Sequence, residues 1–203
     1  VLFRFGAKLS LKDSLAYIEG LTRGEKAQFV RELMANRGPF DQPLREFEYA
    51  QMTFESVMDQ GAYFEFKRHR MMTQTAQALT AHLGFAVPKG MIESGCGEAY
   101  HNVMGQAANL YQKMESWNPD VASYIVPNGF NRRVLFTMNL RQAFHFCNLR
   151  AAENAHFSIR RVAYQVAEAI QQIYPLIGAY LDVPTDGSSQ IILNHNFYST
   201  NET

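Results

Sequence analysis

The stretch RRVLFTMNLRQAFHFCNLR, residues 132–150, changes its hydrophobic period halfway along. In its first half polar and apolar residues alternate as far as Asn139, and the apolar side consists of Val134, Phe136 and Met138. Alternation with a period of two is typical of a β-strand with one buried face. From Leu140 the alternation ends and a helical pattern begins. The stretch therefore predicts a strand over 132–139 that runs directly into a helix over 140–149.

Two arginines of this predicted helix point in opposite directions. At 100° per residue, Arg141 and His145 share a face, whereas Arg150 lies nine residues after Arg141 and on the opposite side. Either the helix ends before Arg150, or it lies between two sites. Asn139 and Arg141, at the helix start, can offer backbone and side-chain donors to an anion. In the simpler alternative, the aromatic residues are core and the polar residues are only surface.

The charge of the chain balances overall but not locally. Its 203 residues contain 19 Lys and Arg and 19 Asp and Glu, which argues against a broad nucleic-acid-binding face. Residues 131–161 nevertheless hold six Arg, no Lys and one acid, and the chain after Arg161 has four acids and no Lys or Arg. Guanidinium groups bind phosphate and carboxylate bidentately, so the arginine-rich segment predicts an anion site. The alternative is a solvated helix face whose arginine stems cover apolar surface.

Other segments complete an α+β pattern. Capping boxes at Ser10 and Thr22 predict helices over 11–19 and 23–36. Helical spacing of apolar residues predicts two more helices, over 97–116 and 155–181. We expect the last helix to end or kink near Pro175. Strands are expected over 45–57 and 73–79, with a short helix or turn over 62–69. We predict an antiparallel sheet flanked by helices in one domain over 1–184, followed by a loose tail over 185–203.

Several function classes lack their motifs. The chain has no glycine-rich dinucleotide or P-loop motif, no serine-hydrolase elbow, and no histidine or cysteine spacing typical of zinc, so we expect no metal. Cys96 and Cys147 stand alone, which favours a reducing, cytoplasmic location. No apolar run reaches the length of a membrane span, and the first residues lack a signal-peptide core. Because the chain begins with Val1, it is expected to be trimmed or part of a longer protein.

A second polar cluster lies in residues 64–70, FEFKRHR. Three cations and an imidazole within four positions are costly to bury without anions, so the cluster is either exposed or built around a phosphate or an acidic partner.

Three segments of the chain together resemble the flavin-dependent thymidylate synthases. The segment RHRMMTQTAQALT at 68–80 resembles the family signature R-H-R-x-x-S-x-N-E-x-S-x-R. Residues 139–160 resemble the family's N-x-R, L-R and N/H-A-Q-x-x-I-R segment, and PFDQ at 39–42 resembles its T-P-F-E-H segment. The likeness runs from about residue 8 to 181.

This resemblance implies a homotetramer of α+β subunits that binds FAD between subunits and methylates dUMP to dTMP, with methylenetetrahydrofolate as the one-carbon donor and NADPH as reductant. The implied cofactor-binding residues are Gly38, Arg68, His69, Arg70, Met71, Asn139, Leu140, Arg141 and His145. The implied dUMP-binding residues are Glu65, Arg68, Arg133 and Arg150. Arg150 takes the catalytic position that favours ionisation of the uracil ring, and neither cysteine is required.

The chain departs from the family pattern late in the signature. The family's Glu, Ser and Arg are replaced by Ala76, Ala78 and Thr80, and the Thr and His of the T-P-F-E-H segment by Gly38 and Gln42. Loss of one Arg from a phosphate site weakens binding by about ten- to a hundredfold. There are therefore two alternatives. One is a non-catalytic or substrate-altered family member, including one half of a fused pair, that binds flavin or acts in assembly. The other is an unrelated α+β binding protein.

Overall fold

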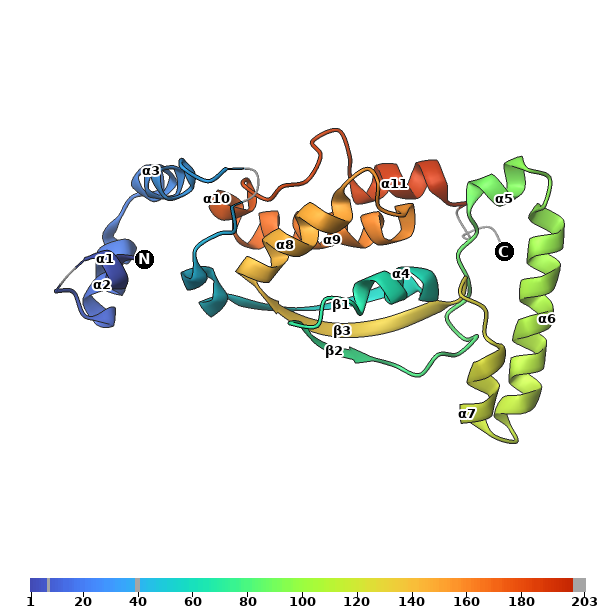
Figure 1. Cartoon of the computed structure of the whole chain (residues 1–203). Helices are drawn as coiled ribbons and strands as arrows, with labels where there is room; N and C mark the ends of the chain where they lie inside the picture. The colour runs from blue at the N-terminus through green and yellow to red at the C-terminus, as the bar shows by residue number, and fades with distance from the viewer. Residues whose placement is uncertain (7, 39–40, 199–203) are drawn as a thin grey trace.

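The computed structural model describes residues 1–6, 8–38 and 41–198, so Ala7, Pro39, Phe40 and 199–203 lie outside the described residues (Figure 1). Its elements, in chain order, are α1 (Leu2–Phe5), α2 (Leu11–Gly20), α3 (Arg23–Met34), the 3-10 helix η1 (Arg45–Tyr49), β1 (Gln51–Asp59), α4 (Gln60–Phe66), β2 (Thr73–Ala76), α5 (Lys89–Glu93), α6 (Gly97–Glu115), α7 (Pro119–Ala122), η2 (Ser123–Ile125), β3 (Asn131–Asn139), α8 (Leu140–Ala151), α9 (Phe157–Ile173), α10 (Pro175–Gly178) and α11 (Ser189–Asn196).

A three-stranded antiparallel sheet in the order β1-β3-β2 forms the centre, so the α+β prediction is confirmed. Gln51 pairs with Asn139, and β1 and β3 stay paired along their whole length. The alternation read from β3 decides its faces: Val134, Phe136 and Met138 are buried, whereas Leu135 between them is exposed. Helices α4, α8 and α9 cover the buried face, and the opposite face of the sheet is left open (Figure 1).

Aromatic side chains join the sheet to its helices. The ring of Phe66, at the end of α4, lies 4.7 Å from that of Phe136 on β3 and 5.5 Å from that of Phe146 on α8. All three side chains are buried, and edge-to-face ring pairs of this kind stabilise a core beyond their area burial. The three elements that carry the sequence motifs are therefore held together by one buried cluster.

The predicted helix over 155–181 is divided at the proline, as expected. Helix α9 ends at Ile173 and α10 begins at Pro175, because proline lacks the N–H that would continue the first helix. Val162, Val166 and Ile170 form the buried stripe of α9. A separate small cluster around Phe130 and Tyr111 holds α6 and α7 at the other end of the molecule (Figure 1).

Two local predictions are wrong. Residues 45–49 form η1 and not a strand, because Arg45 pairs with Glu48 at 3.2 Å across one turn while Phe47 enters the core. The strand begins at Gln51 and extends to Asp59. The strand predicted over 73–79 is also shorter, since β2 ends at Ala76.

The tail predicted to be loose from residue 185 contains a packed helix. The Ser188 hydroxyl caps α11 by accepting a hydrogen bond from the Ile191 N–H at 3.1 Å, and Glu168 on α9 accepts two hydrogen bonds from Ser189. Ile192 is buried against the core. The prediction failed because polar residues in this segment cap and anchor a helix, whereas a composition rich in polar residues is also typical of a disordered tail.

Within the described part of the chain, no helix is long and apolar enough to cross a membrane.

The strand-to-helix junction at Asn139 generates a stability prediction. Asn139 and Gln142 form a reciprocal capping box at the start of α8, so Asn139→Ala should lower the free energy of unfolding by about 1 kcal/mol. Urea unfolding of ligand-free protein measures this. Asn102→Ala, at an exposed position inside α6, is the matched control and should change stability by less than about 0.5 kcal/mol. Equal effects of the two substitutions would contradict the capping role.

Candidate functional site

A polar pocket of about 660 Å3 lies where the loop after α4 meets η1 and the start of α8. Three segments that are far apart in the sequence supply its walls. Its lining residues are Gln42, Arg45, Glu48, Arg68, His69, Arg70, Met71, Met72, Asn139, Arg141, Gln142 and His145. The pocket is therefore formed by tertiary packing of the two arginine-bearing motifs.

This pocket contains all of the cofactor-binding residues inferred from the resemblance, apart from two. Gly38 is outside the lining, and its N–H donates to Asp41 Oδ2 at 2.9 Å. The Leu140 side chain is buried in the core below the pocket, so only its backbone can reach a ligand. The lining also includes residues that the sequence analysis missed, namely Arg45, Glu48, Met72 and Gln142. The spacing of Gln142 after Asn139 fits a capping box and could have placed it there.

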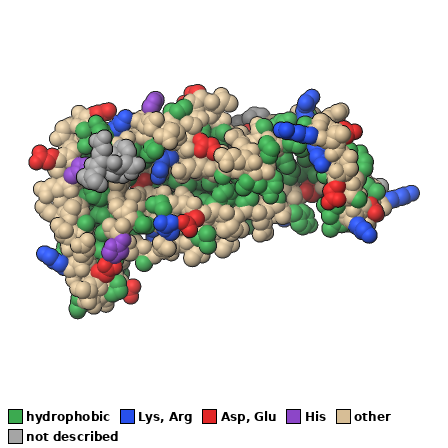
Figure 2. Space-filling model, turned by 180° about the vertical axis from the view of Figure 1, so that it is seen from behind, with side chains coloured by type: hydrophobic (Ala, Val, Ile, Leu, Met, Phe, Trp, Pro, Cys, Tyr) green, Lys and Arg blue, Asp and Glu red, His purple; other side chains and the backbone are tan. Residues whose placement is uncertain are grey.

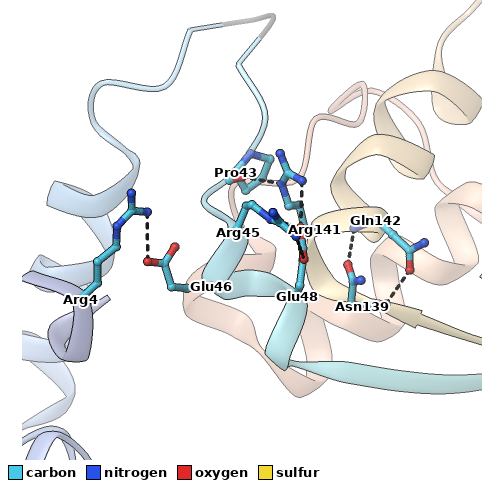
Figure 3. A network of polar contacts seen from close by, with 8 residues as sticks. All are labelled: Arg4, Pro43, Arg45, Glu46, Glu48, Asn139, Arg141 and Gln142. Carbon is cyan, nitrogen blue, oxygen red and sulfur yellow. Dashed lines mark hydrogen bonds and ion pairs between the residues drawn. The ribbon is translucent and has the colours of Figure 1, made fainter. Parts of the chain in front are cut away.

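Arg141 is held in place at the first turn of α8. Its Nε donates to the Pro43 carbonyl at 2.9 Å, and one terminal nitrogen donates to Glu48 at 3.0 Å (Figure 3). Arg45 donates to the same carboxylate at 3.2 Å. The guanidinium of Arg45, followed by that of Arg141, holds the pKa of the Glu48 carboxyl below its usual value, so Glu48 is ionised at neutral pH.

The pocket carries an excess of positive charge. Four arginines and one carboxylate line it, which gives a formal charge of +3 with neutral histidines. The start of α8 adds the positive end of a helix dipole. A concave site with this charge and with planar donors is suited to a diphosphate or another multiply charged anion.

Arg150 lies beside this pocket at the last turn of α8, which is unbroken from Leu140 to Ala151. Its Nε donates to His69 Nε2 at 2.9 Å, and its terminal nitrogens donate to Glu65 Oε2 at 2.6 Å and to the Glu65 carbonyl at 3.3 Å. A guanidinium has five N–H donors, so two remain for a ligand. Arg68 also pairs with Glu65, at 3.3 Å. The structure thus brings together Glu65, Arg68 and Arg150, three of the four residues inferred to bind dUMP.

His69 connects the two groups of arginines. It lines the pocket with Arg141, and its ring lies 5.9 Å from that of His145 while it accepts the hydrogen bond from Arg150. Burial lowers the pKa of His69 to about 4, and the charges of Arg150 and His145 add to this effect. His69 is therefore neutral at pH 7, with Nε2 free of a proton and able to accept from Arg150.

Arg133 is not part of this group. It lies on the open face of the sheet, where it forms an ion pair with Glu55 on β1. It precedes Asn139 by six residues along β3, which corresponds to about 20 Å of extended strand. Arg150 is on α8, which packs on the covered face, so within one chain the two arginines lie on opposite sides of the sheet.

The cysteines are placed where they take no part in this site. Cys147, on the face of α8 that packs on α9, is fully buried, and burial raises the pKa of its thiol to about 12, so it stays protonated at neutral pH. Cys96 is an exposed residue preceding α6. Across residues 1–6, 8–38 and 41–198, no group of three or more His, Cys, Asp or Glu side chains is arranged to hold a metal ion.

The chain is similar in sequence to one protein family over most of its length. The family model described as "Thymidylate synthase complementing protein" matches residues 3–176. A UPF0159 protein of Chlamydia muridarum is 32% identical over 157 residues, which cover 77% of this chain and 29% of that protein. A UPF0159 protein of Thermoplasma acidophilum is 30% identical over 154 residues, 75% of this chain and 30% of that protein.

Relatives with an assigned activity match over a shorter region. The flavin-dependent thymidylate synthase of Saccharolobus solfataricus is 32% identical over 93 residues, which cover 45% of this chain and 33% of that protein. In all three alignments, the matched part spans about a third of the relative's length.

The low pKa of His69 generates a prediction about acid stability. In the unfolded chain a histidine has a pKa near 6.5. Between pH 6.5 and 4 the unfolded state therefore binds a proton at His69, whereas the folded state does not. The stability that neutral His69 contributes above pH 6.5 should be lost progressively as the pH falls toward 4. Urea midpoints measured across this range should fall, and His69→Gln, which keeps an acceptor for Arg150, should flatten the fall.

The control is His195→Gln, at an exposed position near the end of α11, which should keep the wild-type pH dependence. An NMR titration that gives His69 a pKa of 6 or above would contradict this assignment.

Proposed function

Because the chain belongs to the thymidylate synthase complementing protein family, we propose that the pocket beside Arg141 binds the flavin FAD and that the protein takes part in methylating dUMP to dTMP. Methylenetetrahydrofolate would supply the one-carbon unit and NADPH the reducing equivalents. The observation that carries the proposal is the pocket itself, which gathers Arg68, His69, Arg70, Asn139 and Arg141 from distant segments around a formal charge of +3.

The residues present fit a flavin dinucleotide. Its diphosphate carries two negative charges, which the arginines of the pocket and the start of α8 can neutralise. Met71 lines the pocket and is 85% exposed, and Tyr49, which ends η1 beside Glu48, is 91% exposed. Both offer apolar surface to a ring system or to another subunit. This exposure supports a cofactor held between subunits, and we propose a homotetramer on the same ground.

The flavin, when bound, supplies the electron transfer that such a methylation requires. The residues of this chain bind the ligands and stabilise the negative charge that develops on them. Arg150 is only 14% exposed and is held by Glu65 and His69, so its two remaining N–H donors have a defined direction. A guanidinium fixed in this way can stabilise negative charge on a pyrimidine ring more than on the neutral ring. Neutral His69 orients it without adding a competing positive charge.

A second candidate is a family member that binds flavin but has lost or changed the methylation. Two observations favour it. Ala76, Ala78 and Thr80 lack the carboxylate, hydroxyl and guanidinium of the family signature. The UPF0159 relatives match over most of this chain but are about three times as long as the matched part, which is compatible with one half of a fused pair. Under this reading the pocket beside Arg141 is retained and the nucleotide site is altered.

Flavin binding is the first expected outcome. The purified protein should show a flavin absorption spectrum or should take up added FAD. Arg68→Ala removes one pocket cation and should weaken FAD binding by about ten- to a hundredfold, measured by fluorescence titration. Arg31→Ala, on the exposed side of α3, is the matched control and should bind as the wild type does. A colourless protein that takes up no FAD would sink both candidate functions.

The synthase reaction is tested by tritium release from labelled dUMP in the presence of methylenetetrahydrofolate and NADPH. We expect release by the wild type, none from Arg150→Ala, and retained FAD in that variant, because Arg150 lies beside the pocket and not in its lining. Flavin binding without release above a flavin-only control would exclude the synthase and leave the second candidate.

A further inference from the structure

The N-terminal helices border a cavity that is separate from the polar pocket. Helices α1, α2 and α3 extend from the main body as an arm, which Figure 1 shows in blue. Between this arm and residues 173–177 lies a cavity of about 610 Å3, a size typical of small-molecule sites, which we call the arm groove. Figure 2 shows hydrophobic side chains gathered in the hollow between the body and the arm. Among the described residues, none lines both the arm groove and the polar pocket.

Two helices of the arm turn apolar stripes toward this groove. On α2 the stripe consists of Leu11, Leu15 and Ile18, and on α3 it includes Val30 and Leu33. Although they line the groove, Leu11 is 62% exposed and Leu15 is 55% exposed. The apolar walls are therefore accessible from solvent, and a ligand with a hydrocarbon part would remove them from water.

The charged side chains of the arm groove all have the same sign. Arg23 and Lys26 lie within the first four residues of α3, and no Asp or Glu is among the described residues that line the groove. Neither cation forms an ion pair within residues 1–6, 8–38 and 41–198. The start of α3 adds the positive end of a helix dipole. Val30 and Leu33 follow Lys26 by one and two turns, so along α3 the groove wall changes from positive to apolar.

A buried hydroxyl in the same wall lacks a partner. Ser14 lines the groove on α2 and is only 6% exposed. Its Oγ has no hydrogen-bond partner among the described residues. A buried hydroxyl in this situation is costly, and an oxygen acceptor that enters the groove would stabilise it. A pure hydrocarbon supplies no such acceptor.

We propose that the arm groove binds the anion of a long-chain fatty acid, with its carboxylate toward Arg23 and Lys26 and its hydrocarbon chain along the stripes of α2 and α3. The two cations bind a carboxylate by charge-assisted hydrogen bonds, and the same head group brings the oxygen acceptor that Ser14 lacks. From Arg23 to Leu33 helix α3 rises by about 15 Å, which is close to the length of extended laurate. The single sign of the charge favours this ligand over a hydrocarbon or a cationic amphiphile.

Isothermal titration calorimetry with laurate, kept below its micelle concentration, tests the proposal without reference to flavin or activity. We expect the wild type to bind one laurate per chain. Dodecyltrimethylammonium has the same hydrocarbon chain but a positive head, and should bind at least about tenfold more weakly because Arg23 and Lys26 repel it. Decanoate is two methylenes shorter and should bind about four- to fifteenfold more weakly than laurate.

A double variant tests the two cations. Arg23→Gln combined with Lys26→Gln should weaken laurate binding at least about tenfold and should not weaken binding of dodecyltrimethylammonium. The matched control is Lys12→Gln combined with Arg31→Gln, which removes the same charge from exposed positions on α2 and α3 outside the groove lining. This control should bind laurate as the wild type does.

Hydrogen–deuterium exchange of the wild type gives a measurement that no substitution can disturb. Laurate should slow exchange of amides in α2 and α3 and should leave those of α6 unchanged. Protection of α8 in place of α2 and α3 would assign the laurate to the polar pocket and overturn the proposal.

Three results of the calorimetry would also overturn the proposal. One is equal affinity for laurate and dodecyltrimethylammonium, which indicates unspecific apolar binding. Another is unchanged laurate affinity in the Arg23 and Lys26 double variant. The third is a wild type that takes up no laurate, as expected if another polypeptide covers the groove. None of these measurements involves FAD or dUMP, so failure here is distinguishable from failure of the proposed function.

Discussion

The Asn139 side chain accepts a hydrogen bond from the Gln142 N–H at 2.8 Å, and the Gln142 side chain accepts one from the Asn139 N–H at 3.1 Å. These two bonds allow β3 to become α8 without an intervening loop, because they satisfy N–H groups that the first turn of a helix leaves unpaired. The direction of α8 relative to the sheet follows from this junction. Its first turn brings Arg141 to the pocket, and its last turn brings Arg150 to Glu65.

Carboxylates from other elements make this concentration of arginine tolerable. Glu48 on η1 and Glu65 on α4 each contact two arginines, and His69 adds a neutral acceptor where another charge would repel. A partly buried guanidinium without such partners would be costly. Arg45, Arg68 and Arg70 of the pocket are exposed, so its excess of positive charge is accessible from solvent.

The departures from the family pattern fall in two places: Gln42 lines the pocket, and three others lie at the end of the signature at residues 68–80. Positions 68–71 and 139–145, which build the pocket, keep the residues expected for a flavin site, whereas Ala76, Ala78 and Thr80 follow or end the edge strand β2. Short neutral side chains there remove charge-assisted contacts without disturbing the core, because β2 pairs with β3 through its backbone. The backbone pairing of β2 and the pocket lining are thus independent of the side chains at positions 76, 78 and 80.

Local pattern was sufficient to predict β3, α8, α6 and the division of α9 at Pro175, because alternation, helical spacing and proline act through neighbouring residues. The resemblance also named most of the pocket lining. It was the tertiary structure that decided the η1 turn at Arg45, the helix within the predicted tail, the pairing of Arg150 with His69, and the placement of Arg133 on the opposite face of the sheet. These features depend on burial of Phe47 and Ile192 and on contacts between residues about 80 positions apart. Such contacts arise from strand register and helix packing, which no local pattern of residues contains.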